Sequence, residues 1–269
     1  MKTLTDHVGH VIESTTVEGV TFPKLNGRFS HLNNIWLTVQ YTDPENPKQI
    51  TRWDKWRSKA PSLALQNLPQ HEISLTSVVN ISCMCLEKIG KPLNSQLLIQ
   101  CALLHDYGER KVGDITCGTK KAEQERREYE AFAEAYGRLP KIEWLHHQMC
   151  YLIQAAHKEC PYLPMDAQEV LSAIKRDFPH ETEVFPAFEA IDYLFTAYNG
   201  FHRDGVRNIL FSVSARHVST VNHVADVVPG FKEAVWPNET SDYFNRAAQV
   251  YNENPDAYRE PQMEMFEDY

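Results

Sequence analysis

Apolar side chains recur at helical spacing along most of the chain beyond residue 70. Between residues 71 and 89 they form one stripe that Gly90 ends, and Asn94 or Ser95 can cap the next helix. That next helix carries the apolar run that starts at Leu97 and ends in a His-Asp doublet, and others are predicted over residues 123–136, 142–157 and 167–176. The pattern therefore predicts a mainly α-helical fold.

A further predicted helix carries a carboxylate on its apolar face. Pro186 occupies a favourable first position, and Gly200 ends the segment. Asp192 falls on the apolar stripe, four residues after Phe188 and three before Phe195. A carboxylate in the middle of an aromatic face needs a cation, and no Lys or Arg lies on the same face nearby in the sequence. A metal ion is one candidate for that cation.

The two ends of the chain differ from this helical middle. Residues 8–22 are rich in Val, Thr and Ile, and residues 35–41 are typical of a strand, so we expect a small β-containing extension over residues 1–50. Residues 209–228 are apolar and could form a helix or a strand, and residues 252–269 read as a mobile acidic tail. We expect three parts, with boundaries at 1–50, 51–205 and 206–269.

Composition limits the classes of function. A hydrophobic fraction of 42% over 269 residues supports a packed core, and a net charge of −9 argues against a nucleic-acid polymer as partner. We find no apolar run near the length of a membrane span and no signal-peptide layout at the start. The 6 cysteines read as reduced thiols. We expect a cytoplasmic protein that acts on a small molecule, with a homodimer possible.

A His-Asp doublet ends the predicted helix whose apolar run starts at Leu97. His105 continues the apolar stripe, Asp106 follows it, and Glu109 comes one turn later. Buried polar groups must be satisfied, and either a metal ion or a buried His–Asp hydrogen bond would do so here. His71 lies on the stripe of the preceding helix, where a capping or surface role is the alternative.

Four residues thus stand out as candidate metal ligands. They are His71, His105, Asp106 and Asp192. Two imidazoles and two carboxylates suit a divalent ion such as Mn²⁺, Co²⁺, Fe²⁺, Ni²⁺ or Zn²⁺. Coordination positions left to water and substrate would make such a site catalytic.

Two basic clusters are candidates for contacting a substrate. Arg52, Trp53 and Arg57 lie close together, and indoles stack on bases while guanidinium groups match phosphate oxygens. The alternative is an amphipathic surface turn with buried indoles. Lys120 and Lys121 form a second candidate for a phosphate contact, with a solvated pair as the alternative.

This set of residues resembles the HD-domain metal-dependent phosphohydrolases, whose signature is H…HD…D, and within them the bacterial 5′-deoxynucleotidase branch. The likeness rests on the pattern H-D-x-x-E-x-x-x-G-D from His105 to Asp114 and on the 34-residue step from His71 to His105. It also rests on Asp192 in the context I-D-Y-L and on the Arg52-Trp53 pair upstream. The resemblance covers roughly residues 50–200 and implies an HD-domain helical bundle.

The resemblance also implies roles for individual residues. The four candidate ligands would hold one divalent metal ion. Glu109 would handle the proton of the attacking water or of the leaving group, and Asp114 would support it or contact the sugar. Arg52 would face phosphate or sugar and Trp53 the nucleoside, although Arg57 beside the second tryptophan could be the true counterpart.

The implied activity is hydrolysis of a nucleotide phosphate ester, with a (deoxy)nucleoside 5′-monophosphate as the first expectation. A (d)NTP triphosphohydrolase or a phosphodiesterase of cyclic or signalling nucleotides is the alternative on the same fold, and His146, His147 or His157 could then bind a second metal ion. A non-catalytic nucleotide-binding HD module is a third possibility. Glu109 speaks against it, because a pure binder needs no proton-transfer group.

Overall fold

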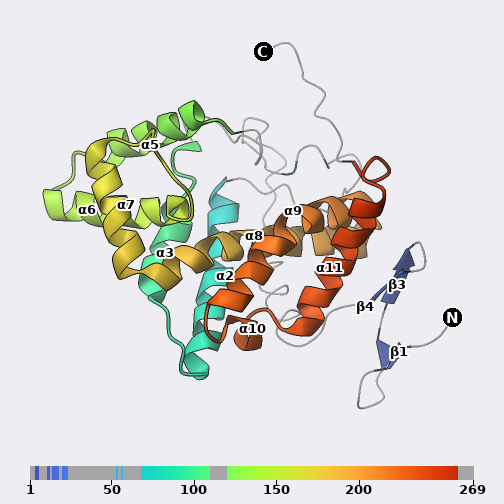
Figure 1. The fold of residues 1–269 in the computed structure, drawn as a ribbon. Helices are drawn as coiled ribbons and strands as arrows, with labels where there is room; N and C mark the ends of the chain where they lie inside the picture. The colour runs from blue at the N-terminus through green and yellow to red at the C-terminus, as the bar shows by residue number, and fades with distance from the viewer. Residues whose placement is uncertain are drawn as a thin grey trace, which may run out of the picture.

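The computed structural model describes residues 68–109 and 120–259, together with Trp53, Trp56 and four short strands near the N-terminus. Helices make up the long described segments, and Figure 1 shows them gathered around α8. The expectation of a mainly helical fold is therefore confirmed. No described helix is both long and apolar enough to cross a membrane.

The strands form two separate antiparallel pairs. β1 (Leu4–Thr5) pairs with β2 (Val11–Ile12), and β3 (Ser14–Val17) pairs with β4 (Val20–Pro23). An isolated two-stranded hairpin is only marginally stable in water. These pairs therefore do not establish a β-containing unit, which stays a prediction, and the strand expected at residues 35–41 lies outside the described residues.

Two neighbouring helices bring the first half of the chain to the site. α2 (Leu68–Lys88) begins three residues earlier than the sequence predicts, and α3 (Ser95–Leu104) follows it. Between them Gly90 adopts a left-handed φ of 72°, and the Asn94 side chain accepts a hydrogen bond from the Leu97 amide at 3.1 Å. The turn and cap confirm the predicted break and start.

Three helices and one 3₁₀ turn form a layer that follows α3 in the chain. They are α5 (Ala122–Tyr136), α6 (Lys141–Leu152), η2 (Ile153–Ala155) and α7 (Met165–Asp177). In this layer α6 packs on α3, and aromatic rings join α5 to α6. Phe132 of α5 stacks on Tyr151 of α6 with ring centroids 4.1 Å apart, and Trp144 packs 5.7 Å from Phe132. The helix expected over residues 142–157 is shorter than predicted, because the chain tightens into η2 after Leu152.

α8 (Pro179–Asp204) is the central helix, and its bounds correct the prediction. The helix begins at Pro179 and ends where Gly205 takes a left-handed φ of 69°, so Pro186 and Gly200 both lie inside it. Side chains around most of its circumference are buried. Packing on several sides stabilises the helix and outweighs the two local helix breakers.

The chain beyond residue 205 folds back on α8 as α9 (Arg207–Val227), α10 (Phe231–Ala234) and α11 (Asn238–Glu253). Residues 209–228, which the sequence left open, are helical up to Val227. Phe188 of α8 packs 5.8 Å from Phe231, and the side chains share one hydrophobic core. The boundary near residue 205 stays a prediction, and residues 260–269 of the expected tail lie outside the described residues.

Replacing Phe188 with Ala tests the central role of α8. Its side chain is fully buried between α8 and α10, so the variant loses apolar burial and gains a cavity. We expect the free energy of unfolding to fall by about 3–5 kcal/mol in a denaturant titration. Leu145→Ala, at a half-exposed position of α6, serves as the control, and equal losses in both variants would contradict this account.

Candidate metal centre

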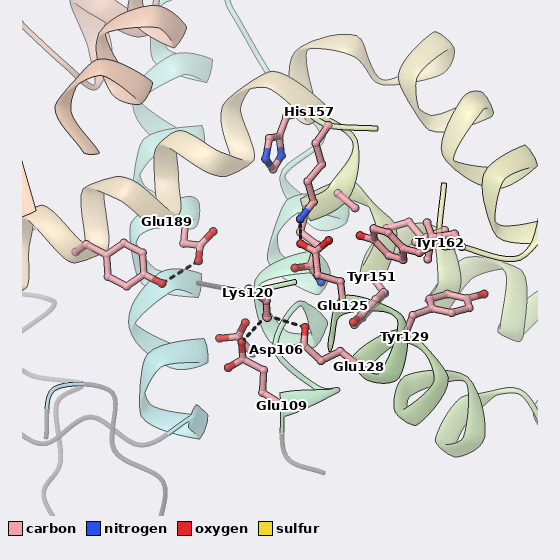
Figure 2. A pocket seen from close by; sticks show the side chains of 16 residues that line it. Asp106, Glu109, Lys120, Glu125, Glu128, Tyr129, Tyr151, His157, Tyr162 and Glu189 are labelled. Atoms are coloured by element: carbon pink, nitrogen blue, oxygen red, sulfur yellow. Dashed lines mark hydrogen bonds and ion pairs between the residues drawn. The ribbon is translucent and has the colours of Figure 1, made fainter. Parts of the chain in front are cut away.

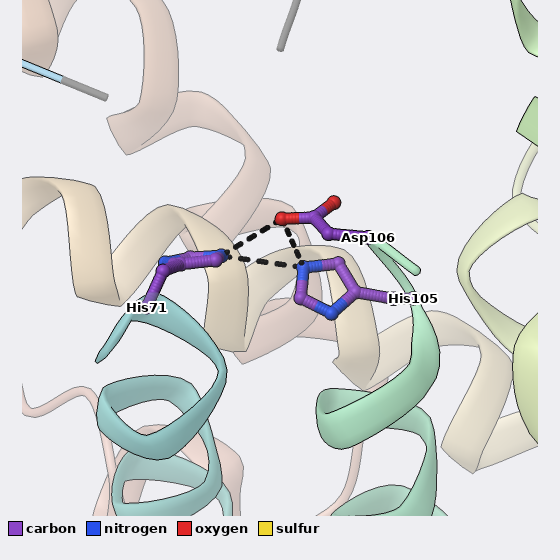
Figure 3. Close-up of side chains that lie close together, drawn as sticks. All are labelled: His71, His105 and Asp106. Atoms are coloured by element: carbon purple, nitrogen blue, oxygen red, sulfur yellow. Dashed lines mark hydrogen bonds and ion pairs between the residues drawn. The ribbon is translucent and has the colours of Figure 1, made fainter. Parts of the chain in front are cut away.

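Three nitrogen and oxygen donors converge between α2 and α3. His71 lies in the first turn of α2, and His105 and Asp106 follow the end of α3 (Figure 3). The two imidazole Nε2 atoms are 3.2 Å apart, and Asp106 Oδ2 lies 3.6 Å from His71 Nε2 and 3.2 Å from His105 Nε2. All three side chains are buried, and Asp106 is the most exposed at 5%.

Hydrogen bonds on the far side of each ring fix which nitrogen faces this cluster. His105 Nδ1 lies 3.0 Å from the Ala102 carbonyl, which can only accept, so Nδ1 carries the proton. His71 Nδ1 lies 3.0 Å from Asp192 Oδ2 and donates to that carboxylate in the same way. In the neutral tautomers that these contacts favour, both Nε2 atoms direct lone pairs toward one another and toward Asp106.

Three lone-pair donors facing one another in a buried space require a positive charge between them. One proton satisfies a single pair of atoms, whereas one cation contacts all three. Ligands bound at about 2.1 Å lie about 3.0–3.4 Å apart around a tetrahedral or octahedral ion, close to the separations found here. The donor set and its spacing thus fit a borderline divalent ion.

Asp192 lies behind His71 rather than among the three donors. Its Oδ1 accepts a hydrogen bond from Ser74 Oγ at 2.5 Å, while its Oδ2 takes the Nδ1 proton of His71. Asp192 is fully buried on α8. The structure thus places it where a carboxylate orients a metal-binding histidine, which differs from the expected fourth ligand.

Aromatic rings hold the two imidazoles from the sides. Tyr193 of α8 stacks on His71 with ring planes 8° apart and centroids at 6.0 Å, and Phe185 meets His105 edge-on at 5.6 Å. Trp53 packs edge-on against Tyr193 at 6.0 Å and is buried. Trp53 therefore lies one ring away from His71, and its predicted contact with a nucleoside stays a prediction.

Glu109 sits one turn after the doublet and pairs with a lysine. Lys120 Nζ lies 3.0 Å from Glu109 Oε1 and 2.7 Å from Glu128 Oε2 on α5. Burial alone lowers the pKa of Lys120, but the two carboxylates outweigh it and raise the pKa above its ordinary value. Lys120 is therefore a fixed positive charge beside Glu109.

Gly108 explains how α5 comes so close to the doublet. A Cβ atom on Gly108 would lie 2.4 Å from the Glu128 carbonyl oxygen and 2.6 Å from the Glu128 Cα. The backbones are thus in direct contact, and only glycine leaves room for that contact.

A cavity of about 350 Å³ opens beside the three donors, within the usual size range of small-molecule sites. Asp106 and Glu109 line one end, where Lys120 joins them (Figure 2). The wall continues along α5, the end of α6 and α8. A substrate in this cavity would reach the candidate metal centre.

The other predicted site residues divide into two groups. Arg52, Arg57 and Asp114 lie outside the described residues, so their roles stay predictions. His146 contacts Gln100 at 2.6 Å, and His147 contacts the Glu143 carbonyl at 2.9 Å. Neither histidine lines the cavity, whereas His157 does. Among the described residues one cluster could hold a metal ion, made of His71, His105 and Asp106.

Sequence reasoning missed several residues that build the site. Glu128 was not singled out from the sequence, yet it precedes Tyr129 and lies four residues before Phe132, on the buried side of α5. That spacing was the available signal. Ser74 lies one turn after His71 on the same face of α2, which could have marked it as a partner. No sequence signal points to Gly108 or to Tyr193.

Replacing Gly108 with Ala should force α5 away from the doublet, because the new methyl group would overlap the Glu128 backbone. We expect a loss of about 1–3 kcal/mol in the free energy of unfolding, measured by denaturant titration. Bound metal should be kept, since the three donors lie on α2 and after α3. A variant as stable as the wild type would contradict the close backbone contact.

Replacing Asp106 with Ala removes one of the three converging donors. After both purified proteins are loaded with Mn²⁺, we expect the Asp106→Ala protein to retain almost none of the metal that the wild type binds. Elemental analysis after dialysis measures it. Glu169→Ala, an exposed acidic position on α7, is the control. Unchanged metal content in the Asp106 variant would remove this cluster as the metal site.

Comparison with known proteins agrees with this geometry. Residues 77–173 match the family model described as HD domain. No curated protein and no solved structure matches the chain. The matched segment contains the His105-Asp106 doublet and the residues of α5 and α6 that line the cavity. This segment is therefore similar to an HD domain, and the His-His-Asp cluster, of which His71 precedes the segment, could hold a metal ion.

Proposed function

We propose that this protein hydrolyses the phosphate ester of a nucleotide, and that a (deoxy)nucleoside 5′-monophosphate is cleaved to nucleoside and phosphate. The observation that carries the proposal is the cluster of three buried donors, one of which, Asp106, lines one end of a cavity together with Glu109 and Lys120. A divalent ion held by His71, His105 and Asp106 supplies Lewis-acid chemistry, which lowers the pKa of water and offsets charge on phosphoryl oxygens.

The residues of the chain perform the remaining steps. Lys120 binds a phosphoryl oxygen, because its ammonium group is held at the mouth of the metal centre by two carboxylates. Glu109 takes the proton of the attacking water and passes it to the leaving sugar oxygen. Asp192 and Ser74 keep the His71 ring in one orientation, so that its Nε2 stays directed at the ion.

The nucleoside part of the substrate is proposed to bind near Trp53. Its indole lies against Tyr193, which lines the cavity, and indoles stack on bases. Arg52 is the proposed phosphate or sugar contact, with Arg57 as its alternative, and Asp114 is proposed to support Glu109 or contact the sugar. The family resemblance supports these assignments.

Replacing Glu109 with Gln tests the proposed proton transfer. We expect bound metal to be kept and phosphate release from nucleoside 5′-monophosphates to fall about 10²-fold or more, because the amide cannot accept the proton. A screen of nucleotides with several divalent ions, reading phosphate against pyrophosphate and triphosphate, identifies the substrate first. Glu130→Gln, on the exposed face of α5, is the control.

Normal phosphate release from the Glu109→Gln protein would remove the proposed role of Glu109. Triphosphate as the released product would exclude the monophosphatase reaction in favour of a triphosphohydrolase. A wild-type protein that binds metal but releases none of these products would leave a nucleotide-binding module instead of an enzyme.

A further inference from the structure

The cavity beside the metal centre carries more negative than positive groups. Among the described residues that line it, carboxylates outnumber ammonium groups by five to two. The carboxylates belong to Asp106, Glu109, Glu125, Glu128 and Glu189, and the ammonium groups to Lys120 and Lys158. Burial lowers the pKa of His157, and the nearby Lys158 lowers it further, so that His157 adds little positive charge at neutral pH.

Both lysines of the cavity are already paired with carboxylates. Lys158 pairs with Glu125, and Lys120 is shared between Glu109 and Glu128 (Figure 2). The two ammonium groups thus offset carboxylates that are already present. A ligand that enters finds the metal centre and Lys120 at one end and an acidic wall beyond them.

Glu128 is the most buried part of that wall. Its side chain is 6% exposed, and its Oε1 has no hydrogen-bond partner within the described part of the chain. Glu125 lies one helical turn earlier on α5 and lines the same cavity. The contact at Gly108 holds this stretch of α5 against the doublet, so the carboxylate cannot easily move away.

We infer that the acidic wall formed by Glu125 and Glu128 selects ligands by phosphate number, so that the cavity takes one phosphoryl group joined to an uncharged remainder and rejects di- and triphosphates. This inference rests on the proposed function and assigns its preference for monophosphates to particular side chains. One phosphoryl group is accommodated by a divalent ion and Lys120. Each further phosphate brings at least one more negative charge, which must lie beside carboxylates.

The size of the effect follows from Coulomb's law. Two like charges a few ångströms apart repel strongly where water is excluded, and the repulsion increases as the effective dielectric constant falls. The cavity wall is largely buried, so salt screens these charges less than it would on the surface. Replacing a wall carboxylate with its amide removes the charge and changes the side-chain shape little.

The test compares inorganic phosphate with tripolyphosphate as ligands of the Mn²⁺-loaded protein. Calorimetric dissociation constants are measured for wild type, Glu128→Gln, Glu125→Gln and the double variant at one fixed concentration of free Mn²⁺. Metal chelation by tripolyphosphate then contributes equally to every protein. In the wild type we expect phosphate to bind more tightly than tripolyphosphate. In the double variant we expect the ratio of the two dissociation constants to change in favour of tripolyphosphate by about tenfold or more.

The ratio of the two constants separates selection from damage to the fold. Loss of packing weakens the binding of both ligands together, whereas removal of a wall charge changes the ratio of their dissociation constants. Glu130→Gln on the exposed face of α5 should leave the ratio unchanged. An unchanged ratio in all three wall variants, or a wild type that binds tripolyphosphate more tightly, would overturn the inference.

The test of the acidic wall measures ligand binding and not turnover, so the inference and the proposed function can fail separately. If the wild type hydrolyses no nucleotide but shows the expected shift in ratio, the wall acts as inferred and the protein is a binder. If the wild type releases phosphate from monophosphates and the ratio does not respond, the enzyme gains its selectivity elsewhere and the inference is wrong.

Discussion

Three buried nitrogen and oxygen donors that face one another are the constraint around which this structure is arranged. The orientation of each ring is set from behind, by the Ala102 carbonyl for His105 and by Asp192 for His71. In the neutral tautomers that these contacts favour, neither nitrogen that faces Asp106 can donate to it. The cluster is therefore electrostatically unfavourable without a cation, and the surrounding contacts with Tyr193 and Phe185 keep it assembled.

A second constraint is the close approach of α5 to the turn that carries the doublet. Gly108 removes the side chain that would separate them, and Lys120 then joins Glu109 to Glu128 across the gap. The same contact forms the Glu109 end of the cavity and its acidic wall. The proposed chemistry and the inferred ligand selection thus depend on one backbone contact, although the residues involved come from different segments of the chain.

The helical core was predictable because its apolar stripes are regular. Gly90 and Asn94 act locally, so the break and the cap they predict agree with the structure. Pro186 and Gly200 are equally strong local signals, yet both lie inside α8, because packing on several sides of a helix outweighs a local preference. Boundaries decided by burial cannot be inferred from local residue preferences.

For the site, residue type and spacing predicted the cluster of His71, His105 and Asp106 as candidate ligands. The position of Asp192 behind the ring could not be predicted, since spacing shows which face a residue occupies and not which atom it meets. Glu128 and Gly108 were missed for a related reason. Their importance arises from a contact between α5 and the doublet, which only the folded chain reveals.

The position of the donors also links ion binding to the entropy of the chain. His71 and His105 lie at the open ends of two helices whose connecting turn, at Gly90, is at the opposite end. An ion that binds both histidines closes a loop of 34 residues, as a covalent crosslink would. If the ion stays bound when the protein unfolds, it lowers the conformational entropy of the unfolded chain. The α2–α3 hairpin and the ion therefore stabilise each other, and the affinity of the site includes the free energy of holding that hairpin closed.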